Sequence, residues 1–564
     1  MTAAASNGGT DYLVIGGGSA GCVLAGRLSE RGATVTLVEA GSDTAGEREP
    51  AEIRDSRFRT MNIAQFYWPG LAAQYTPNGP GPLPYNQACV LGGGSSINGM
   101  HAQRGLPSDY DEWRQLGVVG WGWDDVLPYF KRLETDCDFR NGMHGSTGPI
   151  EIRRVPEQNW SGLSRALASA LDRRGYAKLQ DVNAECGDGY GAVPLNYAGA
   201  RRLSSATAYL TADVRKRPNL RIVTNAVVSS LLVEERRVVG AAFEAAGKTQ
   251  SIRAGETIVS AGALHSPALL MRSGIGPGRD LQAANIAPVV DLPGVGANLN
   301  NHVFIIVSAH LKRSARANPR VKPPSAMLFR YSSRFEGCPQ TDMLLNVWER
   351  VPNPLSWDPL GRQIANFFPT VNKVFSHGCL RLNASRQMEV RFNLLEDSRD
   401  MERMVSAVRK LGDLLGEAPV APLVNAAFAP AFTPRARALM QKNFKAQSLS
   451  VFGALALSGP RALRERLLCD AGTPLGALLA DEEKLRAAIK HAAIPSGHVS
   501  GTCRMGDPSR RDTVVDSRCR VVGIDRLRVV DASIFPTLMA AGTNLSVMMS
   551  AEKAAATIIE DARQ

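Results

Sequence analysis

The sequence lacks long apolar runs, an N-terminal stretch typical of a signal peptide, and closely spaced cysteines. No stretch of the 564 residues approaches the roughly 18–20 apolar residues that cross a bilayer, which predicts no membrane span. The opening MTAAASNGGTDYLVIGGG has neither a basic nor an apolar segment ahead of its first strand, so we expect no secretory signal. The nine cysteines are widely spaced and include no CxxC, which favours free thiols over disulfides or a zinc site. These absences predict a cytoplasmic protein without a metal centre.

The basic residues are numerous but not clustered. The formal net charge is +12, yet the chain has no run of five basic residues and no basic patch interleaved with aromatics. We therefore expect arginines scattered over a solvated surface and no nucleic-acid partner. The composition, with 44% apolar and 21% charged residues, is typical of a globular enzyme. The length predicts at least two domains.

The clearest positive signal is the stretch DYLVIGGGSAGCVLAGRLSERGATVTLVEAG at residues 11–41. An apolar strand, a helix that stops at Gly32 and a second strand rich in β-branched residues form a βαβ unit. The turn between the first strand and the helix contains Gly16, Gly18 and Gly21 in the pattern G-x-G-x-x-G. The unit therefore predicts a phosphate-binding turn at the start of a helix.

Each part of this turn has a physical role in holding a dinucleotide. The first glycine permits the tight turn, the second lets the backbone approach a pyrophosphate, and the third lets helix and strand pack closely. Ser19 and Ala20 follow in the helix N-terminus, whose N–H groups attract phosphate. Glu39, followed by Ala40, ends the second strand and can accept hydrogen bonds from a ribose. The alternative is an ordinary glycine turn, and the pattern does not separate FAD from NAD.

Further strands and helices are predicted along the chain. Residues 220–245 read as a possible meander, and 256–262 and 526–533 as strands. The tail at 544–564 reads as a helix. Between 310 and 450 the sequence mixes strands, prolines and the charged helix DSRDMERMVSAVRKLGDLLG, which indicates a second domain. No repeat and no low-complexity linker is present.

Four other stretches carry a family resemblance. They are ACVLGGGSSINGMHAQRGLPSD (88–109), GALHSPALLMRSGIG (262–276), LPGVGANLNNH (292–302) and the C-terminal pair GHVSGTCRMG (497–506) and VVDASIFPTLMAAGTNLSVMMSAEKAA (529–555). With the opening unit, in this order, they resemble the glucose–methanol–choline (GMC) oxidoreductase family. Within it the chain looks most similar to bacterial choline dehydrogenase-like and hydroxymethylfurfural oxidase-like alcohol oxidoreductases.

The resemblance implies an α/β fold with an α+β second domain. A Rossmann-type FAD-binding domain is expected from residues 8–45, 85–105, 215–310 and 500–564. A substrate-binding domain with a mixed or antiparallel sheet and helices is expected from residues 46–84, 106–214 and 311–499. Both domains are discontinuous in sequence.

The resemblance also implies how FAD would be held. Gly16, Gly18, Gly21 and Glu39 match the family's ADP site, and the loop LGGGSSINGM lies along the flavin. The further matching positions are Gly93, Gly94, Ser95, Asn98, Val228, Asp531 and Ala532. Some members attach FAD through a histidine in this loop, but Ile97 occupies that position here, so we expect non-covalent FAD. His101 lies nearby and is interpreted as a supporting or structural residue.

Two residues match the family's catalytic positions. His498, in GHVSGTCRMG, matches the family's general base. Imidazole suits this role because it has the basicity to take a hydroxyl proton near neutral pH. Asn544, in AGTNLSV, matches the second active-site group, which hydrogen-bonds the substrate oxygen. His491, on a probable helix, is the next candidate for the base. Gly497, where relatives often have an aromatic residue, and Asn301, where Asp is common, depart from the family pattern.

The predicted activity is FAD-dependent oxidation of a primary aryl, furanic or aliphatic alcohol to the aldehyde. Further oxidation of the hydrated aldehyde is also possible chemistry. The electron acceptor is O2 or another acceptor, and the protein is expected to be a monomer or homodimer. A choline-type dehydrogenase and an FAD-containing hydroxynitrile lyase remain as alternatives. Four aromatics could line the pocket although core positions are favoured for each: Trp348, Trp357, Phe367 and Phe368.

Overall fold

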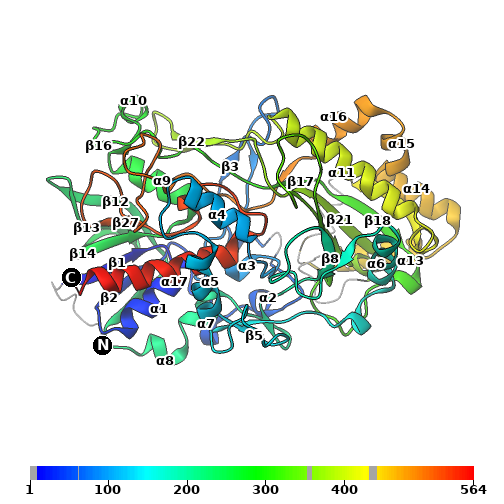
Figure 1. Cartoon of the computed structure of the whole chain (residues 1–564), viewed down its shortest axis with the longest axis horizontal. Coiled ribbons are helices and arrows are strands. Elements are labelled where there is room, and N and C mark those ends of the chain that lie inside the picture. The colour runs from blue at the N-terminus through cyan, green and yellow to red at the C-terminus, as the bar shows by residue number, and fades with distance from the viewer. Residues whose placement is uncertain (1–8, 61–62, 352–358, 431–440, 442, 564) are drawn as a thin grey trace.

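The computed structural model describes residues 9–60, 63–351, 359–430, 441 and 443–563. Its first sheet has the strand order β11-β2-β1-β14-β13-β12, with β27 pairing with β14. The strands are β1 (Thr10–Ile15), β2 (Val35–Val38), β11 (Leu220–Val223), β12 (Ala226–Glu234), β13 (Arg237–Ala245), β14 (Lys248–Val259) and β27 (Leu527–Val529). This sheet occupies the end of the molecule where both termini lie (Figure 1).

Strand β14 joins a parallel and an antiparallel part of this sheet. Its C-terminal half pairs in parallel with β1 and β27, while its N-terminal half pairs with β13 in the meander β12-β13-β14. Strand β2 and the second half of β1 are buried, as expected for short apolar strands of a parallel sheet covered by helices. The predicted βαβ unit and meander are confirmed.

Helices α1 (Ser19–Glu30) and α17 (Thr543–Asp561) pack side by side on this sheet (Figure 1). Their contact includes an ion pair between Arg27 and the fully buried Glu552, with 2.7 Å between nitrogen and oxygen. Helix α9 (Gly262–Arg272) follows β14, and α7 (Ser205–Tyr209) packs on α1. The C-terminal helix therefore lies directly beside the helix that begins at the glycine turn.

The second sheet is larger and mostly antiparallel. Its order is β25-β24-β18-β21-β20-β19-β8-β7, and β17 pairs with both β21 and β26. Its strands are β7 (Ala177–Lys178), β8 (Gly189–Ala192), β17 (Val303–Phe304), β18 (Val307–Leu311), β19 (Met327–Tyr331), β20 (Met343–Trp348), β21 (Ile364–Val371), β24 (Val424–Pro430), β25 (Gly472–Pro474) and β26 (Ile494–Pro495). The predicted α/β fold with an α+β second domain is confirmed.

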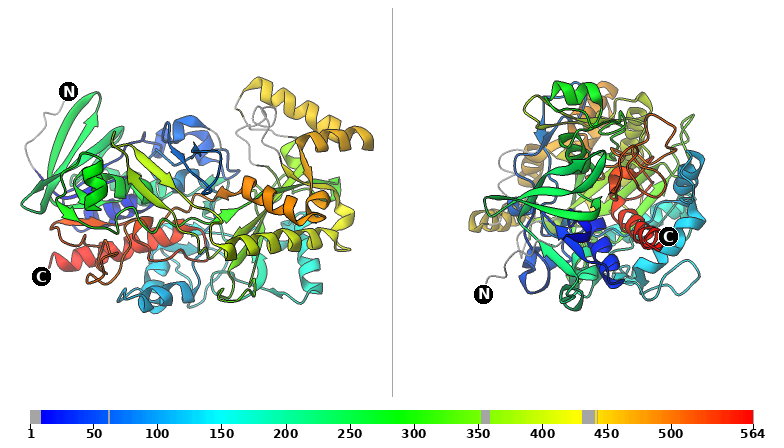
Figure 2. Two further views of the ribbon diagram at one scale, coloured as in Figure 1. Left: turned by 90° about the horizontal axis from the view of Figure 1, so that it is seen from above. Right: turned by 90° about the vertical axis from the view of Figure 1, so that its left-hand side faces the viewer.

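Helix α11 (Ser398–Gly416) covers one face of this sheet, in agreement with the predicted charged helix. Helices α4 (Pro107–Gln115) and α5 (Trp123–Leu133) pack together, and α5 lies against α17. The other helices of this half include α6 (Gly162–Arg173), α13 (Phe444–Leu457), α14 (Arg461–Ala471), the short α15 (Leu475–Leu479) and α16 (Glu482–Ala492). Helices α13 and α14 stand out from the body at the end remote from the termini (Figure 2). The other face of the sheet is left to form a cavity.

The chain passes from the first sheet to the second earlier than the predicted domain limit at residue 310. Strands β17 and β18, at residues 303–311, pair with β21 of the second sheet. Strand β26 pairs with β17, so the segment before His498 belongs to the second sheet as well. At the other predicted domain limits, the strands of the first sheet and those of the second fall on different sides. The division of the chain into two domains stays a prediction.

Two sequence expectations concern what the chain lacks. In the described part of the chain, no helix combines the length and apolar character needed to cross a membrane. Eight of the nine cysteines are free thiols: Cys22, Cys89, Cys137, Cys186, Cys338, Cys379, Cys503 and Cys519. None of these eight cysteines forms a disulfide.

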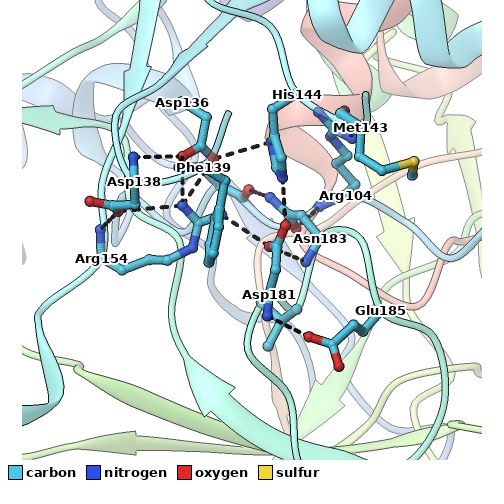
Figure 3. Close-up of polar contacts among 12 residues, drawn as sticks. Arg104, Asp136, Asp138, Phe139, Met143, His144, Arg154, Asp181, Asn183 and Glu185 are labelled. Carbon is cyan, nitrogen blue, oxygen red and sulfur yellow. Dashed lines mark hydrogen bonds and ion pairs between the residues drawn. The ribbon is translucent and has the colours of Figure 1, made fainter. Parts of the chain in front are cut away.

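A buried charge network lies beside the second sheet (Figure 3). Its buried members are three carboxylates and three cations: Glu134, Asp136, Asp181, Arg104, Arg154 and His144. The partly exposed Asp138 also contacts Arg154. His144 Nε2 lies 2.5 Å from Asp181 Oδ2, and its Nδ1 lies 2.9 Å from Glu134 Oε1. Because both ring nitrogens face carboxylate oxygens, both must carry protons to make these hydrogen bonds.

The network balances its own charge when His144 is an imidazolium. Burial alone would lower the pKa of His144, but hydrogen bonds to Asp181 and Glu134 outweigh it and raise the pKa to about 9. Glu134, Asp136 and His144 have the spacing of metal ligands, the one such group among the described residues. Arg104 and Arg154 already contact these carboxylates, so the six buried members form a structural cluster whose charges balance.

Candidate active site

One large cavity lies between the two sheets. Its volume is about 1970 Å³, and it runs from the glycine turn to the open face of the second sheet. A pocket for a single drug-sized ligand has about 300–1,000 Å³. The cavity therefore has room for a dinucleotide and a substrate together. Nearly all the residues predicted to bind cofactor or substrate line it, and Gly21 and Ser95 do not.

The glycine turn has the geometry that its sequence predicts. Gly16 has φ +98°, and a Cβ there would lie 2.5 Å from the Ser260 carbonyl oxygen. A Cβ on Gly21 would lie 1.9 Å from the Gly16 carbonyl oxygen, so this glycine is needed for the helix to pack on the strand. Gly18 has nothing nearer than 3.9 Å and opens onto the cavity. The turn thus offers its backbone to a phosphate, with Ser19 and Ala20 lining the same wall.

Glu39 fixes this turn and also faces the cavity. Its Oε2 accepts a hydrogen bond from Gly17 N–H at 2.6 Å, and its Oε1 accepts one from Gly41 N–H at 2.7 Å. Burial raises the pKa of Glu39 against these two hydrogen bonds. Each carboxylate oxygen keeps a second lone pair for a ribose hydroxyl. Glu39 therefore fixes the turn and, with Ala40, lines the cavity, and its binding of a ribose stays a prediction.

Replacement of Glu39 tests this double role. Glu39→Ala should lower FAD retention more than it changes flavin reduction in the fraction that stays loaded. Glu39→Gln is the matched control, because its amide keeps one acceptor and turns an N–H toward the other backbone N–H. Equilibrium dialysis against FAD should rank retention as parent, Gln, then Ala. Equal FAD retention in all three proteins would show that Glu39 does not bind the cofactor.

The loop at residues 92–98 forms the next part of the wall. Gly93 and Gly94 line the cavity, and a Cβ on Gly94 would meet nothing within 4 Å. Asn98 also lines it, while its Oδ1 accepts hydrogen bonds from Met100 N–H and the Arg202 guanidinium. Ser95 points away, since its hydroxyl donates to the Gly92 carbonyl oxygen at 2.6 Å. Ser95 thus supports the loop from behind.

Three further predicted residues lie along the same cavity. Val228, on β12, and the pair Asp531 and Ala532, directly after β27, all line it. The Asp531 carboxylate accepts hydrogen bonds from Gly262 N–H, the Ser266 hydroxyl and Ser533 N–H. Burial raises the pKa of Asp531 despite these donors. The elements that follow β1, β2, β14 and β27 therefore meet along one elongated site, as a dinucleotide requires.

His498 lies where two motif stretches pair. Ser496 N–H donates to the His302 carbonyl oxygen, and Asn300 and Ser500 exchange two backbone hydrogen bonds. Between these pairs, Asn301 alone on one segment faces residues 497–499 on the other, which makes a bulge around Gly497, with φ +82°. Asn301 Oδ1 accepts the His498 N–H at 3.0 Å inside this bulge. The bulge aims the His498 ring into the cavity.

The His498 ring faces the start of helix α17. A Cβ on Gly542, the residue before this helix, would lie 3.4 Å from His498 Nε2. Burial lowers the pKa of His498 well below 6.5, and the neighbouring His302 and His101 rings lower it further. The Ser19 hydroxyl donates to Asn544 Oδ1 at 2.7 Å, which leaves the Asn544 N–H groups for another partner. A neutral imidazole and an amide donor thus both line the cavity near the start of helix α17.

The far wall of the cavity is made by alternate residues of the second sheet. On β21, Ile364, Asn366, Phe368 and Thr370 line the cavity, whereas Phe367 is fully buried on the other face. The period of two follows from the pleat of a strand. Phe58, Phe304, Trp348 and Phe428 add aromatic rings from neighbouring elements. This end of the cavity is therefore broad and mainly apolar.

Of the four aromatic residues considered as pocket candidates, some line the cavity and others do not. Trp348 and Phe368 line the cavity, Phe367 is in the core, and Trp357 lies outside the described residues. His101 lines the cavity, and burial lowers its pKa to about 4. His491 is exposed near the end of α16 and does not line the cavity. His498 is thus the better placed of the two base candidates.

Sequence analysis assigned no role to His302 or Ser496. His302 Nδ1 lies 2.8 Å from His498 Nδ1, and Ser496 Oγ lies 2.9 Å from the same atom. The signal for His302 was available, because it ends the quoted stretch LPGVGANLNNH. The contact itself depends on the pairing of two segments almost 200 residues apart, which no local pattern shows.

Comparisons with known proteins agree with this geometry. Family models described as GMC oxidoreductase match residues 10–304 and 374–551. The chain is 38% identical to a 5-(hydroxymethyl)furfural oxidase of Methylovorus sp. (strain MP688), covering 98% of this chain and 99% of the relative. It is 29% identical to an oxygen-dependent choline dehydrogenase of Vibrio vulnificus (strain YJ016), covering 97% and 94%.

Solved structures show the same architecture. Pyridoxine 4-oxidase from Mesorbium loti superposes with a TM-score of 0.80 at 26% identity, covering 98% of this chain and 99% of that one. A formate oxidase shares the fold, with a TM-score of 0.82 at 21% identity, covering 99% and 100%. The fold and cavity define a two-domain flavoprotein oxidoreductase that acts on CH–OH groups and uses FAD. The chain belongs to the GMC oxidoreductase family.

Proposed function

We propose that this enzyme oxidises a primary aryl, furanic or aliphatic alcohol to the aldehyde, with His498 as the base. The observation that carries the proposal is the placement of a neutral His498 Nε2 at the junction of the cofactor wall and the apolar wall. Taking the hydroxyl proton at Nε2 makes the carbon a better hydride donor. Bound FAD supplies the hydride acceptor. Asn544 donates a hydrogen bond to the oxygen as it gains negative charge.

The apolar wall favours a neutral aromatic or aliphatic alcohol. The carboxylates among the described lining residues are Glu39, Glu244 and Asp531, and all three belong to the elements of the first sheet. A trimethylammonium group is recognised by an aromatic cage, and we also expect a carboxylate beside it. Aromatic rings are present at this end without such a carboxylate. The 38% identical relative is named for a furanic alcohol, which supports the same substrate class.

A panel of alcohols under anaerobic conditions tests this preference. Benzylic and furanic primary alcohols should bleach the flavin at lower concentration than choline does. Choline as the best substrate would contradict the proposed substrate class without affecting the role of His498. The alternative of a hydroxynitrile lyase predicts cyanohydrin cleavage with no bleaching. The acceptor, O2 or another, and a monomeric or homodimeric state stay predictions.

Asn544 should contribute less than the base. Asn544→Ala should slow flavin reduction by about 10- to 10³-fold, the range for one lost hydrogen bond to a developing oxyanion. Asn544→His, the other residue used by the family at this position, keeps a donor and should lose less. Stopped-flow bleaching at saturating alcohol measures the step. Our assignment of roles is wrong if Asn544→Ala slows flavin reduction more than replacement of His498 by Ala does.

The cofactor should be bound without a covalent link. Ile97 occupies the position of the possible linking histidine and packs beside the small core formed by Ile53, Phe66 and Val90. The flavin should therefore appear in the supernatant after acid precipitation of the purified protein. Yellow colour that stays with the washed precipitate would show a covalent bond elsewhere in the chain.

A further inference from the structure

His302 and His498 form a pair of imidazoles whose hydrogen-bond partners determine where each proton lies. The rings are perpendicular, with centroids 5.1 Å apart, and their Nδ1 atoms face each other at 2.8 Å. Two bare nitrogens cannot make this contact, and neither can two N–H groups. One ring must donate and the other must accept. The remaining contacts of the pair decide which ring donates.

The other nitrogen of His302 is held by carbonyl groups alone. His302 Nε2 lies 2.9 Å from the Asn372 carbonyl oxygen and 3.1 Å from the Met539 carbonyl oxygen. Carbonyl oxygens only accept hydrogen bonds, so Nε2 carries the proton. Burial, with the positive charge of the nearby Lys373, lowers the pKa of His302 to about 4, so the ring is neutral. A neutral imidazole has one N–H, and His302 Nδ1 is therefore the acceptor.

It follows that His498 carries its proton on Nδ1. The Ser496 hydroxyl fits the same arrangement, since it donates toward Asn301 Oδ1 at 3.4 Å and presents a lone pair to the His498 Nδ1–H. Because His498 is neutral as well, its Nε2 has a free lone pair. This is the nitrogen that faces Gly542 and the start of helix α17.

We propose that His302 is a positioning residue that fixes the tautomer of His498, so that the bare Nε2 faces the substrate hydroxyl. This inference rests on the proposed role of His498 as the base. The alcohol O–H bond breaks and its proton moves to His498 Nε2, while the carbon–hydrogen bond gives up a hydride to the bound cofactor. His498 becomes an imidazolium whose Nδ1–H now donates a charge-assisted hydrogen bond to His302 Nδ1. His302 itself gains and loses no proton.

The framework that holds His302 also holds the substrate side of the site. Asn372, at the end of β21, donates from its amide to the Ala540 carbonyl oxygen at 2.8 Å. Lys373 binds Asp109 and the Leu538 carbonyl oxygen at 2.9 and 3.0 Å. The segment 538–542 is thus anchored to the second sheet just before helix α17 begins. The same anchors therefore set the His302 tautomer and the position of Asn544.

Two substitutions separate the acceptor from the anchor. In His302→Asn, the side-chain oxygen sits near the former Nδ1 and can accept from His498. In His302→Gln, the amide reaches the former Nε2 position and leaves His498 Nδ1 without this acceptor. We expect His302→Asn to reduce flavin at a rate close to that of the parent. His302→Gln should be slower by about 10- to 100-fold, as for other partners that orient a functional imidazole.

The direct readout is the tautomer of His498 in the FAD-loaded protein. Nitrogen-15 NMR of histidine-labelled protein distinguishes protonated from bare ring nitrogens, and a His498→Gln sample assigns the signal. The parent should show His498 with Nδ1–H and a bare Nε2, and His302→Gln should show a mixture of tautomers. An Nε2–H tautomer in the parent overturns the proposal without any His302 variant. So does an unchanged tautomer in His302→Gln, whatever its rate.

The tautomer of His498 is read without any substrate. If no alcohol reduces the flavin while the parent has the expected tautomer, the proposed function fails and the proton arrangement stands. If both variants lose FAD or unfold, the parent spectrum still decides the tautomer. Equal loss of rate in the Asn and Gln variants, with His498 still in the Nδ1–H form, assigns His302 to packing and contradicts its positioning role.

Discussion

His498→Ala should keep FAD and lose about 10² to 10⁴ of the rate of flavin reduction by alcohol, the range for removal of a general base. We expect the variant to keep the local backbone structure. The His498 ring faces the cavity, and Asn301 binds its backbone N–H, so the bulge does not depend on the ring. Stopped-flow bleaching at saturating alcohol isolates the step from reoxidation.

The same reaction should show a shifted pH profile. Only neutral imidazole accepts the proton, and burial, with the His302 and His101 rings nearby, lowers the pKa of His498 well below 6.5. The parent rate should therefore rise with pH through an ionisation on the acid side of 6.5 and be level through neutral pH. His498→Ala should lack this ionisation. His491→Ala, a change at an exposed position on α16, is the matched control and should behave as the parent.

Loss of His144 should produce the second large effect, on stability. His144→Gln leaves the buried Glu134, Asp136 and Asp181 with one cation fewer, and breaking a buried ion pair costs about 3–5 kcal/mol in free energy of unfolding. The side chains of His144, Glu134 and Asp136 have no exposed surface. Denaturant unfolding of the loaded enzyme at pH 6.5 measures the change. His491→Gln is the control and should leave stability unchanged.

The pH dependence of stability has a definite sign. The folded-state pKa of His144 is raised to about 9 from an ordinary value of 6.5. Its contribution is therefore complete below pH 6.5 and is lost as pH rises from 6.5 through about 9. The parent should lose stability across this window, and His144→Gln should lack that component. A parent whose stability is flat between pH 6.5 and 9 would show that His144 is neutral in the folded protein.

The sequence predicted the cofactor end of the site better than the substrate end. Gly21 and Glu39 act within residues 16–41, which one short motif covers, whereas the close approach of Gly16 to Ser260 depends on a distant segment. Phe367 and Phe368 differ only in which face of β21 they occupy, and that depends on the register of a sheet assembled from distant segments. Ser95 matched a family position, yet its hydroxyl turns to Gly92 behind the loop.

The catalytic neighbourhood was predicted in part for the same reason. His498 and Asn544 each stand in a recognisable stretch, and both line the cavity. Their partners His302 and Ser19 were identified as motif residues, without the contacts that matter. Those contacts join residues 196 and 525 positions apart in sequence. The charge network around His144 left no sequence signal, because its members come from separate loops and strands whose proximity only the fold creates.

The central claim is that this protein oxidises an alcohol by hydride transfer to its own FAD. The most direct measurement is the absorbance of the purified, oxygen-free holoenzyme after addition of a primary benzylic or furanic alcohol. We predict that the flavin bleaches in the parent, with release of the aldehyde in equal amount, and that His498→Ala bleaches far more slowly. A flavin that stays oxidised in the parent with every primary alcohol tested would contradict the claim.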